Sequence, residues 1–330
     1  MNIFITLDYE LFFGAHTGSV QESIIKPTNH LTELLDPYNI SATFFVDSGY
    51  LLALERQKKQ YPQLEDDYTV IKNQLKELVA KGHSIELHIH PHWEDSFFDG
   101  KKWHMNTKRY RLDCFKQEEV TNIFDRYTNV LTKITNKKPI AYRAGGWSAQ
   151  PFSNLKPGFE SNNLRIDSSV YPQGFYSSSL QNFDFRAIDP YVTQYSFDEN
   201  LTKQEENGKF LEVPISSIKV TPLFFWKFAS KKLIKNKEHK PFGDGSAIPL
   251  STRQKLKLLT ISSYSVVSID GFKSTLIQKA FTNYTQRAKT HKHFVLIGHP
   301  KAFTPYSLKK LKEFIESTKD HHNFVTYEIV

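Results

Sequence analysis

The sequence predicts an α/β fold in which parallel strands alternate with helices. Short apolar runs of strand length alternate along the chain with segments that have helical periodicity. The chain has 330 residues, of which 39% are hydrophobic and 14% aromatic, so it is long and apolar enough for a full-sized core. Polar residues with catalytic chemistry follow several of the strands, as they do at the active end of parallel α/β folds.

The N-terminal third can be read as successive βαβ units. Residues 2–7 (NIFITL) and 41–47 (SATFFVD) are apolar runs typical of buried strands, and residues 26–40 between them predict a helix that a proline stops. Residues 66–82 have apolar positions at helical spacing and end in glycine, which predicts a second helix. Residues 84–88 (SIELH) then predict the next strand.

The same alternation continues toward the C-terminus, although less regularly. Residues 117–136 predict an amphipathic helix. Further strands are expected at 139–147, 164–169, 209–216, 293–299 and 323–330. Residues 170–290 lack a clear alternation, so we expect loops with short strands and helices there. We predict one domain over residues 1–330, with 170–290 as an elaborated segment.

Composition narrows the class of partner. The net charge is +8, which suits nucleic acid, anionic lipid or a phosphorylated substrate. The lysines are scattered and no nucleic-acid module has its signature here, so we expect no nucleic-acid partner. The stretch 220–237 (VTPLFFWKFASKKLIKNK) combines aromatic residues with lysines, which is typical of contact with an anionic membrane but also of a buried helix with a solvated lysine face.

Cysteine usage and the N-terminal sequence bear on location. Cys114 is the one cysteine, which excludes a disulfide within the chain and a cysteine-based zinc site, and agrees with a reducing compartment. Residues 1–10 (MNIFITLDYE) do not have the pattern of a signal peptide, and no apolar stretch has the length of a spanning helix. We therefore expect a cytoplasmic protein, peripheral to the inner face of the membrane.

A histidine cluster is the first candidate for chemistry. The stretch 83–95 (HSIELHIHPHWED) holds four histidines. His88 and His92 can converge on one ion from a loop or a first helical turn, while Pro91 holds His90 in an extended conformation that points elsewhere. Two histidines with one carboxylate form a common catalytic zinc set. The alternative is a solvated, histidine-rich loop.

A pair of carboxylates is the second candidate. Asp8 and Glu10 lie two residues apart at a strand end and therefore face the same side, while Tyr9 faces the other. Two carboxylates on one side repel each other unless a proton or a cation lies between them. One would bind a divalent ion and the other would take a proton from water; either could be the ligand. The alternative is that both are solvated turn residues.

Three further polar residues follow strands elsewhere in the chain. Arg143 follows the strand that begins at 139, Asp167 lies at the end of the next, and His299 follows a late strand. Taken singly, Arg143 would be read as a sheet-edge arginine and His299 as a polar core histidine. Because they share a strand end with the carboxylates and histidines, we predict one site instead.

Five sequence motifs in a fixed order support this interpretation. They are TLDYE (6–10), GHSIELHIHPH (82–92), YRAGGW (142–147), RIDSSVYP (165–172) and LIGH (296–299). This ordered set resembles the five motifs of the polysaccharide deacetylase family, the NodB-homology branch of carbohydrate esterases, over nearly the whole chain. The resemblance implies a distorted (β/α)7-type barrel. The first motif departs from the family in its D-x-E spacing, and the third has glycines where many members have proline.

The resemblance also implies a metal centre. Glu10, His88 and His92 would bind a divalent ion, with zinc favoured and cobalt, nickel or iron(II) as alternatives. Asp8 would act as general base. Arg143 would pair with Asp8 and keep it ionised.

The remaining roles concern the leaving group and the substrate pocket. His299 would be the general acid that protonates the departing amine, and Asp167 would orient His299 and raise its pKa. Leu296 and Trp147 would wall the pocket for the acyl methyl group.

The expected activity is metal-dependent N-deacetylation of an amino sugar during capsule or O-antigen biosynthesis. The substrate would be a nucleotide-linked or lipid-linked sugar. The alternatives are a deformylase or a metal-free amidase on the same fold, and a glycan-binding protein without catalysis.

Overall fold

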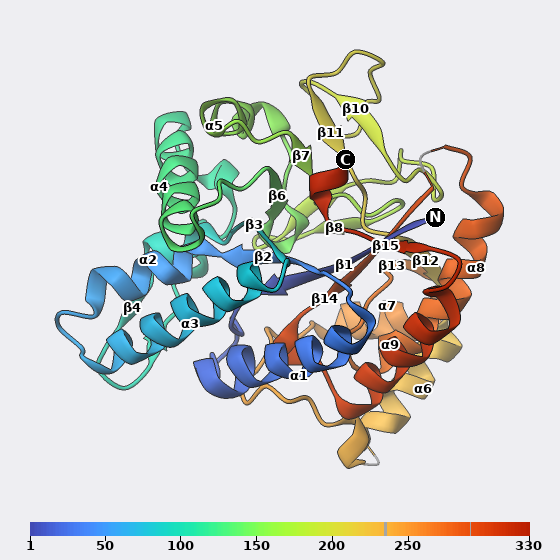
Figure 1. The fold of residues 1–330 in the computed structure, drawn as a ribbon, viewed down its shortest axis with the longest axis horizontal. Coiled ribbons are helices and arrows are strands. Elements are labelled where there is room, and N and C mark those ends of the chain that lie inside the picture. Colours follow the sequence, from blue (N-terminus) through green and yellow to red (C-terminus); the bar gives the residue numbers. More distant parts are fainter. Residues whose placement is uncertain (234–235, 291) are drawn as a thin grey trace.

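A curled, mostly parallel sheet forms the centre of the computed structural model, which describes residues 1–233, 236–290 and 292–330 (Figure 1). In spatial order its strands are β10 (Tyr195–Phe197), β11 (Phe210–Glu212), β7 (Ile166–Asp167), β6 (Ala141–Ala144), β3 (Ser84–Ile89), β2 (Thr43–Asp47), β1 (Asn2–Tyr9) and β14 (His293–Gly298). Neighbours run parallel except β10 and β11, and β15 (Asn323–Phe324) pairs with the start of β1. The predicted fold class is confirmed: the sheet is an open, curled half-barrel.

The open side of the half-barrel is bridged by backbone hydrogen bonds outside the named strands. Ser216 N donates to Val295 O at 3.0 Å, and Ile297 N donates to Val267 O at 3.1 Å. The segments after β11 and β13 therefore lie against β14. This curvature brings the C-terminal ends of β1, β3, β6 and β14 toward one region.

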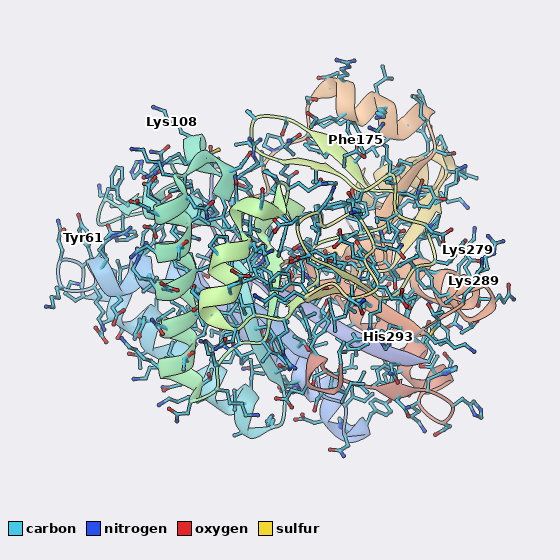
Figure 2. The ribbon with its side chains drawn as sticks, turned by 90° about the horizontal axis from the view of Figure 1, so that it is seen from above. Tyr61, Lys108, Phe175, Lys279, Lys289 and His293 are labelled. Atoms are coloured by element: carbon cyan, nitrogen blue, oxygen red, sulfur yellow. The ribbon has the colours of Figure 1, made fainter. Side chains whose placement is uncertain are left out.

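The helices surround the sheet (Figure 1). Those flanking the main strands are α1 (Lys26–Leu35), α2 (Ser48–Gln57), α3 (Gln63–Ala80), α4 (Gln117–Thr135), α5 (Lys156–Asn162), α8 (Ile277–Arg287) and α9 (Pro305–Thr318). The helices expected at 26–40, 66–82 and 117–136 correspond to α1, α3 and α4. Seen from above, Tyr61 and Lys108 lie toward one end of the molecule and Lys279 and Lys289 toward the other (Figure 2).

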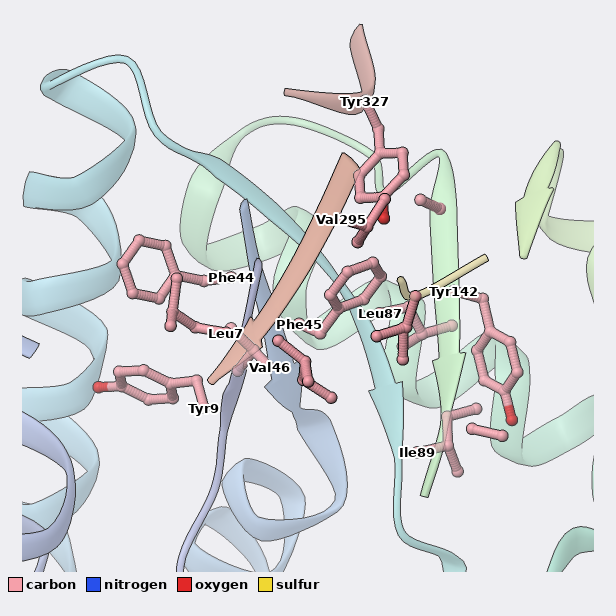
Figure 3. Packing of buried hydrophobic residues seen from close by; sticks show 14 of the residues in the cluster. Leu7, Tyr9, Phe44, Phe45, Val46, Leu87, Ile89, Tyr142, Val295 and Tyr327 are labelled. Atoms are coloured by element: carbon pink, nitrogen blue, oxygen red, sulfur yellow. The ribbon is translucent and has the colours of Figure 1, made fainter. Parts of the chain in front are cut away.

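The core explains why the strands read as continuous apolar runs. Leu7, Phe45, Leu87 and Val295 come from four different strands and are almost completely buried. The ring of Phe45 lies beside that of Tyr327, with 5.7 Å between the centroids (Figure 3). Both faces of a parallel sheet are covered, so nearly every strand position must be apolar. The polar exceptions in these strands are therefore informative about function.

The C-terminal strand expected at 323–330 is wrong beyond Phe324. The chain leaves the sheet there and forms a short 3-10 helix, Tyr327–Ile329. The Tyr327 hydroxyl reaches Ser168 Oγ at 2.7 Å inside the barrel. A tyrosine that closes the floor of the barrel has replaced continued strand pairing.

Residues 170–290 contribute strands to the main sheet and several additions. Within this range, β8 (Phe175–Ser177) pairs with β9 (Asn182–Asp184), and β12 (Ser217–Val220) pairs with β13 (Ser263–Val266), each as a two-stranded sheet outside the main one. Earlier in the chain, β4 (Phe97–Phe98) and β5 (Trp103–His104) form another two-stranded sheet. The excursion from β12 to β13 includes α6 (Pro222–Leu233) and α7 (Thr252–Thr260). In the described part of the chain, every helix is too short or too polar to cross a bilayer.

Candidate active site

A buried ion pair joins the ends of β1 and β6. Arg143 has no exposed surface and donates from Nη1 to Asp8 Oδ1 at 2.7 Å. Its other nitrogens donate to Thr6 Oγ1 at 2.9 Å and to Ser168 O at 2.9 Å, and its guanidinium lies 4.1 Å from the ring centroid of Phe45. A buried charge is stable only when it is paired and hydrogen-bonded, and Arg143 meets both conditions. Asp8 is thereby held in one orientation.

Glu10 lies beside two histidines that come from β3 and its end. Glu10 Oε2 is 3.1 Å from His88 Nε2 and 2.6 Å from His90 Nε2. All three side chains are buried, and one potential ligand atom from each lies within 4.8 Å of the others. His88 and His90 are two residues apart on an extended segment, which places both on the same side.

The hydrogen bonds around His88 make this cluster suitable for a cation. His88 Nδ1 is 2.8 Å from the carbonyl oxygen of Arg143, so it carries the proton that this acceptor requires. In the neutral ring Nε2 then presents a lone pair to the Glu10 carboxylate, and two acceptors at 3.1 Å repel each other. Burial opposes the charged form of His88, but Asp8 and Glu10 outweigh it and raise its pKa. A proton or a metal ion resolves the repulsion, so these residues fit a divalent ion.

His92 differs from the expected ligand set. Its ring stacks on Tyr110 at 5.2 Å and on Trp93 at 5.3 Å between centroids, and neither of its nitrogens has a hydrogen-bond partner among the described residues. Burial holds its pKa well below the usual value. The structure therefore brings together Glu10, His88 and His90, whereas the sequence predicted Glu10, His88 and His92. A 3-10 helix begins at Pro91 and carries His92 into the aromatic stack.

His299 faces the carboxylates from the end of β14. Its Nε2 is 3.6 Å from Asp8 Oδ2 and 3.8 Å from Glu10 Oε1. Its Nδ1 is 2.7 Å from Asp270 Oδ2, and its backbone N donates to the same carboxylate. Burial would lower the pKa of His299, but the three carboxylates, Asp270 first, raise it above the ordinary value.

The carboxylate expected to orient His299 was Asp167, and the structure places Asp270 there instead. Asp167 accepts hydrogen bonds from Ser169, and it interacts with Glu212. Burial raises the pKa of both carboxyls, and for Glu212 the Asp167 charge adds to the effect. Asp270 was missed because it lies in the segment without clear alternation, although VVSID (266–270) is itself an apolar run that ends in a carboxylate.

Lys301 is a second residue that sequence reasoning missed. Its Nζ donates to Glu10 Oε1 at 2.8 Å and also to the backbone carbonyl of Leu11, and it lies 5.2 and 4.8 Å from the ring centroids of Phe12 and Phe13. The ammonium helps to hold the pKa of Glu10 well below its usual range in spite of burial. The two oxygens of Glu10 therefore have separate partners, with the histidines at Oε2 and Lys301 at Oε1.

A cavity of about 330 Å³ opens onto these groups. Glu10, His299 and Lys301 are its charged or titratable lining, with Ser178 and Gln181 also polar. Most other lining side chains are aromatic or aliphatic, among them Phe12, Phe13, Tyr110, Tyr176, Ile248 and Leu250. The residues expected to wall the acyl pocket lie elsewhere in the described structure. Leu296 is completely buried within β14, and Trp147 packs against Tyr171 and Phe183.

The arrangement resembles what amide hydrolysis requires. Asp8, held by Arg143, faces His299, which is hydrogen-bonded to Asp270. The cluster of one carboxylate and two histidines lies beside them. Such a set can accept a proton, deliver a proton and bind a Lewis acid. Residues 25–151 match the sequence model of the family described as polysaccharide deacetylase. A polysaccharide deacetylase domain lies in this chain.

The matched range covers part of the candidate site. It includes the three histidines of HIHPH and Arg143, and it excludes Asp8, Glu10 and His299, which join the site through β1 and β14. The comparison with curated proteins found no match. The family match indicates a hydrolase acting on amide bonds, as predicted.

Two solved structures share the fold of this chain. A "probable polysaccharide deacetylase" from Pseudomonas aeruginosa is 12% identical, with a TM-score of 0.51, and the match covers 99% of this chain and 88% of that one. PuuE allantoinase is also 12% identical, with a TM-score of 0.54 and the same coverage of both chains. At this identity the likeness shows the fold alone.

Proposed function

We propose that this protein is a divalent-metal-dependent N-deacetylase that removes the acetyl group from an amino sugar. The observation that carries the proposal is the approach of Asp8 and His299, 3.6 Å apart, beside the cluster of Glu10, His88 and His90. One group can take a proton and the other can give one within the same small volume.

Asp8 acts as the general base in this proposal. Arg143 holds one Asp8 oxygen at 2.7 Å, while the other faces His299 and is free to accept a proton from water. An ionised carboxylate is the form that accepts a proton. Water adds through its oxygen to the acetyl carbon, and its proton passes to Asp8.

His299 acts as the general acid. Asp270 fixes the ring through Nδ1, so Nε2 points toward Asp8 and into the cavity. In the charged form Nε2 carries the proton that the departing nitrogen needs. The carbon–nitrogen bond then breaks, and the amine leaves with the proton from His299. The second proton of the water leaves with acetic acid, which ionises to acetate, and Asp8 returns its proton to His299, 3.6 Å away.

Glu10, His88 and His90 are the residues that would hold the ion, and zinc is favoured by the donor set, with cobalt, nickel and iron(II) as alternatives. A bound divalent ion lowers the pKa of water and polarises a carbonyl oxygen. Lys301 and the Arg143 carbonyl position these ligands from outside.

We propose that the substrate is an amino sugar used in surface polysaccharide biosynthesis, such as capsule or O-antigen, and is carried on a nucleotide or a lipid. The aromatic lining of the cavity supports a sugar substrate, because aromatic faces pack on the apolar faces of sugar rings. A cytoplasmic location beside the membrane belongs to the same proposal. Cell fractionation that finds the protein outside the cytoplasmic and inner-membrane fractions would contradict that location.

Release of acetate from N-acetylamino sugars, with and without a chelator, tests the reaction. We expect release that the chelator abolishes and that added zinc or cobalt restores. Release of formate from N-formyl sugars alone would identify a deformylase. Glycan binding without hydrolysis would identify a binding protein.

One observation favours a second candidate, a metal-free amidase. Lys301 already supplies Glu10 with a cation at 2.8 Å. Hydrolysis that is unaffected by the chelator, in protein that contains no metal by elemental mass spectrometry, would favour this candidate over the first.

A further inference from the structure

Residues 217–266, which we call the excursion from β12 to β13, have the same net charge as the whole protein. Residues 217–266 contain ten lysines and arginines and two acidic residues, an excess of eight positive charges, which equals the +8 of the whole chain. The rest of the chain is therefore balanced. Of the two acids, Asp244 accepts from Ser19 N and Ser23 Oγ, which leaves Glu238.

The same excursion carries most of the exposed apolar surface. Seven of the ten large hydrophobic side chains exposed among the described residues lie within it: Leu223, Trp226, Phe228, Ile248, Leu250, Leu256 and Ile261. Leu223 and Leu256 are each 61% exposed, and Trp226 is 58% exposed. Such grouping on a protein surface marks an interaction site.

The helices of the excursion are held to each other and to the body. Trp226 Nε1 on α6 donates to Leu259 O on α7 at 3.1 Å. The chain between the helices is fixed by backbone hydrogen bonds from Phe242 N to Phe303 O and from Gly14 N to Ser246 O, each at 2.9 Å. The apolar and basic side chains are thus presented from an ordered base.

The excursion also reaches the active-site cavity. Residues 247–250, which immediately precede α7, line the cavity together with Tyr176, and the Tyr176 hydroxyl accepts a hydrogen bond from Gln254 at the start of α7. Residues 247–250 therefore join the start of α7 to the lining of the cavity.

We infer that α6, α7 and residues 247–250 form a docking surface for an anionic lipid bilayer, and that the amino sugar reaches the cavity on a lipid carrier. The choice of a lipid over a nucleotide carrier rests on the proposed deacetylase function, whereas the docking itself does not.

Charge and apolarity together single out a membrane. Lys227, Lys231, Lys255 and Lys257 are exposed, and in the described structure none of them has an acidic partner within salt-bridge distance. Bulky apolar side chains at this surface can enter the boundary between headgroups and acyl chains, while the lysines attract anionic headgroups. A nucleic acid would use the lysines but leave Leu223 and Leu256 in water.

Flotation with vesicles of phosphatidylcholine, with or without phosphatidylglycerol, tests the docking. We expect binding to the phosphatidylglycerol vesicles only. Reversing Lys255 and Lys257 together (Lys255→Glu, Lys257→Glu) should weaken binding by about 25-fold or more, because each basic residue near an anionic surface contributes about fivefold. The matched control Lys101→Glu with Lys108→Glu changes the same charge on exposed side chains at the end of the molecule that carries β4, opposite α6 (Figure 1), where Lys108 also lies (Figure 2). It should retain binding.

Tryptophan emission reports the apolar part of the contact. Trp93 and Trp103 are buried and Trp147 is partly buried, so Trp226 is the tryptophan that bilayer insertion would shift to shorter wavelength. The shift should vanish in Trp226→Phe. Equal binding to both kinds of vesicle, unchanged binding in the Lys255/Lys257 variant, or a dimer in solution that Trp226→Ser dissociates would overturn the membrane assignment.

Deacetylation of two substrates separates the two proposals. With an N-acetylamino sugar on polyprenyl diphosphate in phosphatidylglycerol vesicles, the Lys255/Lys257 variant should lose at least tenfold in rate. With a nucleotide-linked N-acetylamino sugar in solution its rate should equal that of the unmodified protein. Turnover of the nucleotide-linked sugar alone would overturn the lipid carrier. No turnover of either sugar, with intact vesicle binding, would refute the deacetylase function and leave the docking in place.

Discussion

The two sides of the candidate site differ in whether protein groups supply the hydrogen-bond partners of their buried side chains. On one side Arg143 uses its nitrogens on Asp8, Thr6 and Ser168, and His299 uses Nδ1 on Asp270. On the other side His90 Nδ1 lacks a hydrogen-bond partner in the described structure. On the first side protein groups fix Arg143, one Asp8 oxygen and the His299 ring, whereas the second side gathers lone pairs around Glu10.

This difference indicates how the work is divided. Hydrogen bonds from protein groups fix the orientation and the protonation state of a buried side chain. This suits side chains that transfer protons. Several lone pairs that face one buried point repel each other unless a cation lies between them. This arrangement suits side chains that bind a metal ion. The predictions below test this division, beginning with the largest effect.

Asp8→Asn should lower kcat for acetate release by about 10²–10⁴-fold, because a neutral amide cannot take the proton from water. The amide can still accept from Arg143, so the fold and the metal content, measured by elemental mass spectrometry, should not change. Loss of the metal along with the activity would mean that Asp8 belongs to the ligand side of the site.

Single alanine variants of the three histidines test which of them are ligands. His88→Ala and His90→Ala should each reduce bound divalent ion to a small fraction of one per chain, because each removes a nitrogen that faces Glu10. His92→Ala serves as the matched control and should retain the ion, since its ring packs between Tyr110 and Trp93. Retention in His90→Ala with loss in His92→Ala would restore the set predicted from the sequence.

Lys301→Met tests the cation that faces Glu10. Removing one partner of a buried ion pair commonly costs about 3–5 kcal/mol, because the other charge is left unpaired. We expect chelator-treated Lys301→Met to have a lower Tm than chelator-treated unmodified protein, and we expect zinc to raise the Tm of the variant more. An equal rise in both proteins would show that Lys301 and the ion act independently.

Much of the frame could be predicted from the sequence, and the fine geometry of the site could not. Apolar runs and the polar residues after them located β1, β3, β6 and β14, and the structure brings Asp8, Arg143 and His299 together, as a parallel sheet requires. The choice between His90 and His92 depends on where a 3-10 helix begins, which spacing alone does not determine. Pro91 was read as pointing His90 away, yet the extended backbone at His90 keeps its side chain on the His88 side.

Residues that arrive from irregular segments were the hardest to predict. Asp270 contacts His299 from a segment that has one isolated bridge to β14. Because this segment is not a regular strand, hydrophobic periodicity does not predict its position. Lys301 lies three residues after the end of β14 and looks like any surface lysine in the sequence. Only the curled sheet shows that both lie at the same end as Glu10.

Glu86 provides the smallest and most specific test, because it shares one face of β3 with His88 but serves the fold alone. Its Oε2 accepts from the backbone N of Ile140 and of Ala141, each at 2.8 Å, and Ser84 Oγ donates to Oε1 at 2.6 Å. Burial raises the pKa of Glu86 from 4.5 to about 7.

A raised folded-state pKa makes the stabilising contribution of Glu86 greatest at low pH. Below about pH 4.5 both the folded and the unfolded chain keep the proton; between there and about pH 7 only the folded chain keeps it, so stability falls as pH rises. The total loss is at most about 3 kcal/mol, from 1.36 kcal/mol per pKa unit. Glu86→Gln keeps an acceptor for the two backbone N–H groups and cannot ionise, so its stability relative to the unmodified protein should rise between pH 4.5 and 7. Comparing the two proteins by urea unfolding at each pH cancels the titration of Asp47, whose pKa burial also raises to about 7. A stability difference that does not vary with pH would mean that Glu86 is ionised in the folded protein and that β3 carries a buried charge at this position.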